Sequence, residues 1–263
     1  MDATLNRRIG EFVIQGRIGR GGSATVYSAF QASVNRSVAL KVIDLRTEMH
    51  SGESDMYERR FAQEARVLAS LEHPHIVPIY QYGIVENEYA YIAMRLMHGS
   101  LRDMINGTPL PVQQAVDIIL QLISGLSYAH KNGVIHRDIK PGNVLFDEAG
   151  SAYLADFGLA KTSDLSLGMS APGTLVGTVL YICPEQIRNN RSDHRSDIYS
   201  LGVLFYEMLT GRLPYEAQNL NMLSTLYKIE YEEPLPPRKI NPEIPPELER
   251  VVLQALRKEP RER

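Results

Sequence analysis

The most constraining feature of this chain is the stretch at residues 136–158, which reads HRDIKPGNVLFDEAGSAYLADFG. It places Asp138, Lys140, Asn143 and Asp156 near turn-forming residues, between a helical pattern upstream and short apolar runs typical of strands. Two carboxylates and an amide on adjacent loops provide the oxygen ligands that Mg²⁺ prefers alongside phosphate oxygens. In such a site Asp138 would accept a hydroxyl proton, and Lys140 would offset phosphate charge.

The competing interpretation of this stretch is a pair of loops with solvated charges. For any one of the four residues alone, that interpretation describes the more common case. The joint spacing of all four is much harder to explain in this way. We therefore take a metal and phosphate site as the working hypothesis.

Composition is ordinary for a soluble globular protein of one large domain or two lobes. The chain has 263 residues, of which 44% are hydrophobic and 22% are charged, and its net charge is -3. Because the charge balance is not basic, we expect no nucleic-acid partner. Cys183 is the only cysteine, which excludes an intrachain disulfide and fits a reducing compartment.

We expect a cytoplasmic protein whose residues make no membrane contact. The N-terminus lacks the apolar core of a signal peptide. The longest apolar stretch, around residues 198–209, is shorter than the roughly 20 residues that span a bilayer. The same features fit the cytosolic domain of a longer, membrane-anchored protein.

The first hundred residues predict a sheet with one helix, followed by a hinge at Gly99-Ser100. Strand patterns occupy residues 11–18, 25–30, 37–45, 76–85 and 88–96, and a helical pattern occupies residues 58–71.

A glycine-rich turn, GRGGSATVY at 19–27, joins the first two of these strands. Gly19, Gly21 and Gly22 would let backbone N–H groups approach a polyphosphate. β-Branched and aromatic residues follow this turn where a dinucleotide-binding motif requires a helix, which disfavours a nicotinamide dehydrogenase. A glycine-rich hairpin without a ligand stays open as the alternative.

One lysine interrupts the apolar strand SVALKVIDL at 37–45. Lys41 shares a face with Ala39 and Ile43, which we expect to be buried, and a buried ammonium needs an anionic partner. Glu64 falls on the apolar face of the following helix. We infer a Lys41–Glu64 pair, and the alternative is two unrelated surface charges.

The second half of the chain is mainly helical. Helical patterns occupy residues 112–130, 197–209 and 247–258. The middle one is apolar nearly all round, with Asp197 interpreted as its N-cap and Gly211 as its C-terminal cap. Six prolines between 231 and 246 indicate an extended surface connection, with a partner-binding polyproline segment as the alternative.

In chain order, these motifs resemble the signature of protein kinases. The segments IGRGGSATVY, HRDIKPGN, GTVLYICPEQ and SDIYSLGVLFYEMLTGRLPY are similar to eukaryotic-type Ser/Thr protein kinase domains, especially those of the bacterial branch. The resemblance covers residues 11–263 and implies an α+β, two-lobed kinase fold. It implies an N-lobe at 11–97 with an antiparallel five-stranded sheet and one helix, and a mainly helical C-lobe at 98–263. The family's last C-lobe helix is expected to be absent from these residues.

The resemblance implies transfer of the γ-phosphoryl group of ATP to protein Ser or Thr hydroxyls, with Asp138 accepting the hydroxyl proton. Catalytic roles are implied for Asp138, Lys140, Lys41, Glu64, Asn143 and Thr178. Contacts to ATP are implied for Ile18, Gly19, Arg20, Gly21, Gly22, Ser23, Val26, Ala39, Lys41, Met94, Arg95, Met97, Leu145 and Asp156. Asn143 and Asp156 would hold Mg²⁺, with Mn²⁺ as a substitute.

The resemblance also implies finer assignments. Met94 would be the gatekeeper, and the backbone of Arg95 and Met97 would bond the adenine. Lys140, two residues after Asp138, is typical of Ser/Thr-directed members. Four residues would form the apolar spine of the active state: Leu68, Ile79, His136 and Phe157.

Arg137, next to Asp138, suggests control by phosphorylation of the loop that follows Gly158, because a phosphate could form charge-assisted bonds with it. Thr174 is the first candidate site and Ser170 the second. We expect autophosphorylation in trans, and the family implies protein substrates and a homodimer.

Two positions depart from the family pattern, and a third position matches it. Ala24 replaces the third glycine of the loop, at a cost of about 1–2 kcal/mol if that position needs a left-handed backbone. Cys183 replaces an alanine, which should be tolerated. Arg263 resembles the arginine that pairs with Glu185. A pseudokinase scaffold that binds nucleotide without catalysis is the alternative function.

Overall fold

The structure of the chain is a computed structural model, which describes residues 7–21, 24–45, 54–85, 88–157, 180–189, 192–215 and 222–263. The chain divides into two compact units, residues 1–98 and 99–263, and each is described by itself. Six residues singled out in the sequence lie outside the described ranges: Gly22, Ser23, Gly158, Ser170, Thr174 and Thr178. Among the described residues, no helix is both long and apolar enough to cross a lipid bilayer.

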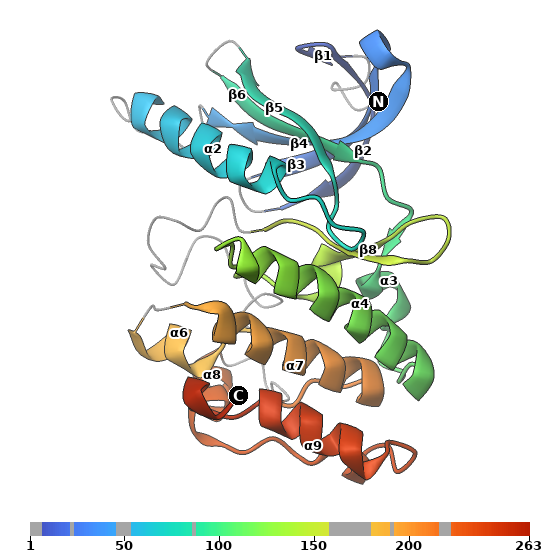
Figure 1. Cartoon of the computed structure of the whole chain (residues 1–263), viewed down its shortest axis with the longest axis vertical. Helices are drawn as coiled ribbons and strands as arrows, with labels where there is room; N and C mark the ends of the chain where they lie inside the picture. Colours follow the sequence, from blue (N-terminus) through green and yellow to red (C-terminus); the bar gives the residue numbers. More distant parts are fainter. Residues whose placement is uncertain are drawn as a thin grey trace. The chain divides into compact units, whose positions relative to one another are not determined.

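The first unit contains an antiparallel sheet with the strand order β1-β2-β3-β4-β6-β5 (Figure 1). Its strands are β1 (Arg8–Ile9), β2 (Phe12–Arg20), β3 (Ala24–Gln31), β4 (Arg36–Asp44), β5 (Ile79–Val85) and β6 (Tyr89–Arg95). Five of them were predicted, and the two-residue β1 is an addition to that prediction. Gly10 adopts a positive φ of 57°, which turns the chain so that Ile9 pairs with Phe12.

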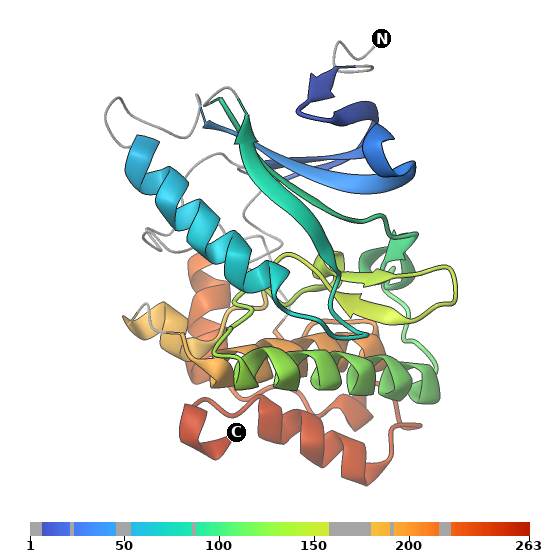
Figure 2. The ribbon, with the colours of Figure 1, turned by 45° about the horizontal axis from the view of Figure 1, so that its top comes forward.

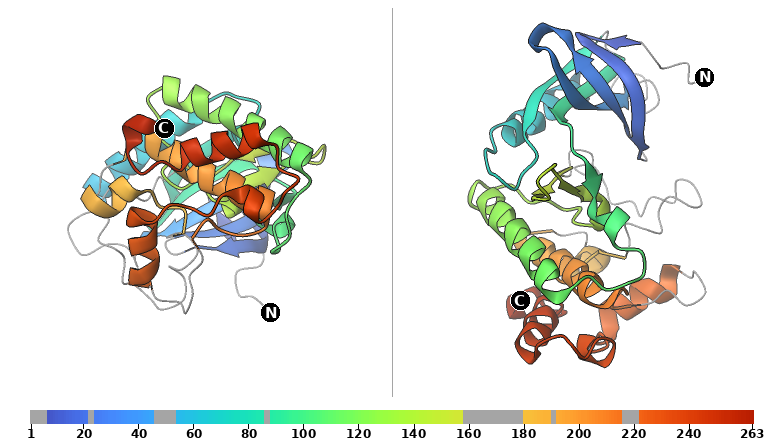
Figure 3. Two further views of the ribbon diagram at one scale, coloured as in Figure 1. Left: turned by 90° about the horizontal axis from the view of Figure 1, so that it is seen from below. Right: turned by 90° about the vertical axis from the view of Figure 1, so that its right-hand side faces the viewer.

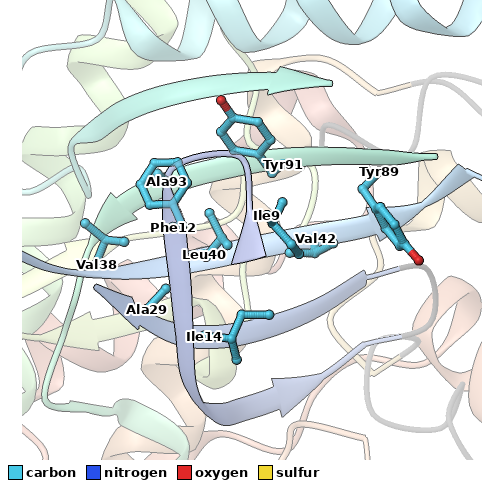
Figure 4. Close-up of a cluster of buried hydrophobic side chains, with 10 residues drawn as sticks. All are labelled: Ile9, Phe12, Ile14, Ala29, Val38, Leu40, Val42, Tyr89, Tyr91 and Ala93. Atoms are coloured by element: carbon cyan, nitrogen blue, oxygen red, sulfur yellow. The ribbon is translucent and has the colours of Figure 1, made fainter. Parts of the chain in front are cut away.

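The added strand helps to bury one face of the sheet (Figure 4). Phe12 meets the ring of Tyr91 edge-on at 5.5 Å between centroids. The buried cluster comprises Ile9, Phe12, Ile14, Ala29, Val38, Leu40, Val42, Tyr89, Tyr91 and Ala93. Because side chains alternate along a strand, the neighbours of Leu40 on β4, including Lys41, point to the opposite face.

The helix α2 (Ser54–Ala69) of the first unit runs alongside the sheet and packs against β5 (Figure 2). Phe61 and Ala65 are its buried contacts, as the helical pattern of apolar residues predicts. The short 3₁₀ helix η1 (Ala32–Val34) joins β3 to β4. The described part of the unit therefore combines a sheet with the helix α2, as expected.

The second unit begins with a small sheet of β7 (Gly99–Ser100), β8 (Val144–Phe146) and β9 (Ala152–Leu154). The short helix α3 (Leu101–Met104) follows β7 directly. Asp103 accepts hydrogen bonds from both the backbone and the hydroxyl of Ser100, which forms a capping box at its start. The 3₁₀ helix η2 (Pro141–Asn143) leads into β8.

Helices are the predominant secondary structure in the described residues of the second unit, which confirms the predicted α+β class. They are α4 (Val112–Lys131), α6 (Pro184–Asn189), α7 (His194–Thr210), α8 (Met222–Tyr231) and α9 (Pro246–Ala255), with 3₁₀ turns η4 (Pro237–Lys239) and η5 (Pro260–Glu262). The helix α7 packs between α4 and α9, and Figure 3 shows these helices running beside one another. As expected, α7 is buried nearly all round.

The ends of α7 confirm one predicted cap and correct the other. Gly211 adopts a φ of 69° and donates its N–H to the carbonyl of Glu207, as a C-terminal glycine cap should. The N-cap is Asp193, and Asp197 lies inside the first turn with 1% of its surface exposed. The carboxylate of Asp197 is engaged with another segment, so Asp193 takes the capping role.

On α9 the helical pattern at 247–258 predicted an apolar face, and this face is only partly buried, because Val251 is 58% exposed.

The predicted pair between Glu185 and Arg263 is present. Two guanidinium nitrogens of Arg263 lie 2.6 and 2.7 Å from the two carboxylate oxygens of Glu185. The Arg263 side chain is fully buried and lies over the ring of Tyr199, with 4.9 Å to the ring centroid. Its remaining donors reach the carbonyls of Arg195, Arg257 and Lys258. The pair therefore ties α6 to the segment after α9.

Replacing Arg263 with alanine should destabilise the second unit by about 3–5 kcal/mol, because it leaves the Glu185 carboxylate buried without its partner. Burial alone would raise the pKa of Glu185, but the hydrogen bonds and charge of Arg263, together with other hydrogen bonds to the carboxylate, lower that pKa overall. Stability from this pair should therefore be lost as pH falls below the usual range of a glutamate, about 4.3. Urea unfolding between pH 3 and 7 measures both effects, with exposed Arg261→Ala as the control. Equal stability of the two variants would contradict this account.

Candidate active site

The segment that follows α4 is held in place by one buried carboxylate from α7. Asp197 accepts the backbone N–H of His136 through Oδ2 and the backbone N–H of Arg137 through Oδ1, each at 2.8 Å. The ring of His130, near the end of α4, also contacts Oδ2 at 2.8 Å. Arg137 adopts a positive φ of 64°, which is uncommon for a residue with a side chain. Asp197 thus fixes an unusual backbone conformation directly before Asp138.

The structure brings together three of the predicted catalytic residues of this segment. Lys140 Nζ lies 2.8 Å from Asp138 Oδ2, and both side chains are largely buried. Asn143 donates its amide nitrogen to the same oxygen at 2.9 Å and to the Asp138 carbonyl at 2.8 Å. Two donors on one carboxylate oxygen fix the orientation of the group and hold its negative charge in place.

The two predicted metal ligands lie on loops that are hydrogen-bonded to each other. The N–H of Ala155, next to Asp156, donates to the Asn143 carbonyl at 2.9 Å. Because the amide nitrogen of Asn143 is committed to Asp138, its side-chain oxygen is the group that can bind a cation. Asp156 adopts a positive φ of 59°, a conformation that aspartate tolerates better than most residues.

The side-chain oxygens of Asn143 and Asp156 suit Mg²⁺, which commonly binds one or two carboxylates together with phosphate oxygens. Within the described part of the chain, no three His, Cys, Asp or Glu side chains are grouped so that they could hold a metal alone. An amide and a carboxylate on adjacent loops therefore fit a cation that arrives with a nucleotide better than they fit an all-protein metal site.

His136 and Phe157 stack, as the resemblance implied, with ring centroids 4.4 Å apart. His136 is fully buried, and its Nε2 lies 3.0 Å from the Ala155 carbonyl. Burial lowers the pKa of His136 despite nearby carboxylates, so the imidazole stays neutral at physiological pH. The other two members of the predicted spine, Leu68 and Ile79, are half-buried in the first unit. The four-residue spine stays a prediction.

In the first unit the glycine-rich turn is closed by a hydrogen bond of 2.8 Å from the Gly21 N–H to the Ala24 carbonyl. A side chain added at Gly19 would meet nothing within 4 Å, and one at Gly21 only the Ala24 carbonyl at 3.5 Å. Local crowding therefore does not require these glycines, and their bare backbone leaves the turn open to a ligand. The flanking residues Ile18 and Arg20 are exposed.

The expected cost of Ala24 is not incurred. Ala24 begins β3 and pairs with Ile43 on β4. It is not among the residues with positive φ, so its backbone is one that alanine adopts without strain. The third glycine of the family pattern is therefore dispensable at this position.

The pairing of β3, β4 and β6 places several predicted adenine and phosphate contacts of the first unit on neighbouring strands. Lys41 lies between Val26 on β3 and Ile92 on β6. Ala39 lies opposite Met94, and both of these side chains are buried.

Lys41 and Glu64 lie on β4 and α2 of the same unit, and both are half-buried. Each takes part in polar interactions, so neither is an isolated charge. The pairing of these two residues stays a prediction.

The segment after β6 refines one predicted contact. The Arg95 N–H donates to the Pro78 carbonyl at 3.0 Å, so this N–H is occupied within the unit, and the adenine contact of the Arg95 backbone stays a prediction. Met97 follows as a half-buried residue. In the second unit, Leu145 lies on β8 between Ser100 and Tyr153.

Two positioning residues on α7 were missed by the sequence reasoning. One is Asp197, which was interpreted as a cap. The other is Glu207, whose carboxylate accepts a hydrogen bond from the Tyr181 hydroxyl. Burial raises the pKa of Glu207. The sequence contains a signal for both residues, because each is an acidic residue within the largely apolar run DIYSLGVLFYEML.

Comparison with known proteins gives three findings. Residues 12–263 match the family described as protein kinase domain. The serine/threonine-protein kinase PrkC of Bacillus subtilis (strain 168) is 36% identical over 259 residues, which are 97% of this chain and 39% of PrkC. The serine/threonine-protein kinase PknB of Mycobacterium leprae (strain TN) is 37% identical over 251 residues, which are 94% of this chain and 39% of PknB.

The crystal structure of the Mycobacterium tuberculosis PknI kinase domain superposes with a TM-score of 0.74 and 25% identity, and it covers 100% of this chain and 94% of that one. This likeness confirms the predicted kinase fold class. The chain spans well under half the length of PrkC and of PknB. Because the family match extends over residues 12–263, the chain belongs to the protein kinase domain family, and its relatives include the bacterial serine/threonine kinases.

Proposed function

We propose that this chain is an ATP-dependent protein serine/threonine kinase domain. The observation that carries the proposal is the Asp138 carboxylate, which Lys140 and Asn143 hold on a segment anchored by Asp197. A carboxylate with this orientation suits the acceptance of a proton from an attacking hydroxyl. The hydroxyl oxygen would bond to the γ-phosphorus of ATP as the bond to the bridging oxygen breaks, and ADP would leave.

Other residues near Asp138 would bind the metal ion and stabilise negative charge on the phosphate and the hydroxyl. Asn143 and Asp156 would hold Mg²⁺, which when bound neutralises charge on the phosphate oxygens. Lys140, 2.8 Å from Asp138, would stabilise negative charge near the hydroxyl. Its position two residues after Asp138 supports Ser and Thr over Tyr as acceptors, and protein side chains as substrates.

The first unit would bind the nucleotide. Its glycine turn suits phosphate oxygens, because the N–H groups of Gly19 and Gly21 can approach them without side chains in the way. Lys41, paired with Glu64, would hold the α- and β-phosphates. Buried Ala39 and Met94 would contact the adenine, and the Arg95 carbonyl would accept its amino group.

Arg137 supports control by phosphorylation of the loop after Gly158. Among the described residues, its Nε is a buried donor without a hydrogen-bond partner. A phosphate on Thr174 or Ser170 would supply the missing acceptor and compensate the guanidinium charge. We infer autophosphorylation in trans within a transient homodimer. The need for ATP and the buried, unpaired Cys183 support a cytoplasmic setting.

Replacing Asp138 with asparagine should reduce phosphate transfer by about 10²–10⁴-fold, because the amide cannot accept the hydroxyl proton. Nucleotide affinity should change little. Radiolabelled ATP transfer to a generic basic protein and to the chain itself measures the first effect, and nucleotide titration measures the second. The control is Glu148→Gln, an exposed site on the β8–β9 turn. Equal transfer by wild type and Asp138→Asn would exclude the role of Asp138, and nucleotide binding without transfer by the wild type would favour the scaffold.

Replacing Asp197 with asparagine should lower kcat by roughly 10- to 100-fold, the effect of losing about 1.5–3 kcal/mol from hydrogen bonds to a charged group. The KM for ATP should stay near the wild-type value, because Asp197 acts on the His136–Arg137 backbone and not on the nucleotide. The matched control is Asp193→Asn, since asparagine is as good an N-cap as aspartate. A KM effect as large as the kcat effect would argue against a positioning role.

Incubation with Mg-ATP should phosphorylate Thr174 or Ser170, and phosphopeptide mapping identifies which. Phosphorylation should raise activity in the wild type but not in Arg137→Gln, because the neutral side chain cannot compensate a phosphate. Mixing active chain with Asp138→Asn tests transfer in trans. The regulatory assignment fails if residues 158–179 stay unmodified or if Arg137→Gln responds like the wild type.

A further inference from the structure

The chain contains two Asn-Gly dipeptides, Asn106-Gly107 and Asn132-Gly133, and all four residues are exposed. A glycine after asparagine carries no Cβ that would crowd its backbone nitrogen, so this nitrogen can approach the carbonyl carbon of the asparagine side chain. Both glycines adopt a positive φ, 87° at Gly107 and 75° at Gly133. The two dipeptides therefore share their composition and exposure, and they differ in the hydrogen bonds that hold them.

Two hydrogen bonds hold the second dipeptide at the end of α4. The Gly133 N–H donates to the His130 carbonyl at 3.0 Å. The side-chain nitrogen of Asn132 donates to the Tyr128 carbonyl at 2.9 Å, which holds the amide group back along the helix. An attack of the Gly133 nitrogen on the Asn132 side chain would therefore have to break both bonds first.

The first dipeptide lies in the loop between α3 and α4, and these two hydrogen bonds have no counterpart there. The Gly107 N–H donates no hydrogen bond to any residue that the structure describes. A Cβ built on Gly107 would meet nothing within 4 Å, so neighbouring groups leave this part of the backbone open. The free nitrogen of Gly107 therefore follows directly after an exposed asparagine side chain.

A neighbouring hydroxyl contacts the side-chain carbonyl of Asn106. Thr108 Oγ1 donates to Asn106 Oδ1 at 2.7 Å. When a nucleophile adds to the carbonyl carbon, negative charge develops on this oxygen, and a donor that already points at the oxygen stabilises that charge. The loop thus combines an accessible nitrogen nucleophile, an amide carbonyl and a donor for the oxyanion.

We propose that Asn106-Gly107 is a site of spontaneous deamidation. The Gly107 nitrogen loses its proton to hydroxide and attacks Cγ of Asn106. The new bond between this nitrogen and Cγ closes a succinimide ring, and the Nδ2 group takes a proton from water and leaves as ammonia. Water then opens the ring. Opening at one carbonyl gives aspartate, and opening at the other gives isoaspartate, in which the main chain runs through the former side chain.

Isoaspartate would lengthen the main chain of a loop that is fixed against the end of α7. The Leu110 N–H donates to the Met208 carbonyl at 2.8 Å, which ties the loop to the last turn of this helix. The Gly107 carbonyl oxygen would lie only 2.8 Å from a Cβ built on Gly211, the C-terminal cap of α7. An extra methylene group in the loop therefore has to displace one of these contacts, and the product should be less stable than the original chain.

Incubation of the whole chain at neutral and at mildly alkaline pH tests the proposal, with peptide mass spectrometry and isoaspartyl methyltransferase labelling as readouts. The peptide containing residues 106–107 should gain aspartate and isoaspartate, and faster at alkaline pH because hydroxide deprotonates the attacking nitrogen. The peptide containing residues 132–133 is the control within the same sample. It should react roughly 5- to 100-fold more slowly, since two hydrogen bonds must break first.

Two substitutions separate the chemistry from its consequence. Thr108→Val removes the hydroxyl and should slow the reaction at Asn106 roughly two- to tenfold, the effect of one hydrogen bond. Incubated wild type should unfold at a lower urea concentration than fresh wild type. Incubated Asn106→Gln should match its fresh sample, because the longer side chain would have to close a larger ring. The proposal is overturned if residues 106–107 stay unmodified or react no faster than residues 132–133.

Discussion

The geometry of the catalytic segment depends on one buried carboxylate. Asp197 is 1% exposed, and removing a charge from water is unfavourable unless hydrogen bonds replace the lost solvation. Two backbone N–H groups and the His130 ring provide that replacement. The same bonds hold Arg137 at a positive φ. The backbone conformation that orients Asp138 is therefore stabilised because the buried Asp197 carboxylate, on the helix α7, needs these hydrogen bonds.

Polar contacts connect the segment that Asp197 holds to the other residues of the site. Asp138 follows Arg137 and accepts Lys140 and Asn143, and the Asn143 carbonyl accepts the N–H of Ala155 beside Asp156. A network of this kind stabilises one arrangement when each member is satisfied. Arg137 Nε is the exception among these described groups. A buried guanidinium nitrogen that lacks an acceptor among the described residues is consistent with the phosphate contact that we propose for Arg137.

The sequence predicted the parts of the site that are close together along the chain. Asp138, Lys140 and Asn143 lie within six residues, so the local course of the chain brings them close together. Gly211 was predicted for a similar reason, since its cap depends on local backbone geometry alone. Asp197 was misassigned because its partners lie some 60 residues away. The cost expected at Ala24 was a conditional inference from the family pattern, and only the backbone conformation at Ala24 could decide it.

The helix α7 shows how fold and function are divided within one element. Its apolar residues determine that it is buried, and many apolar substitutions of similar size would serve that purpose. Three of its buried polar residues each hold a different segment: Ser196 donates to Glu185, Ser200 donates to the Tyr181 carbonyl, and Asp197 anchors the catalytic segment. A polar residue in a fully buried helix is unfavourable without a partner, so each one implies a contact elsewhere in the chain. Such interruptions of an apolar pattern are therefore the positions at which a sequence indicates long-range positioning residues, even when it cannot name their partners.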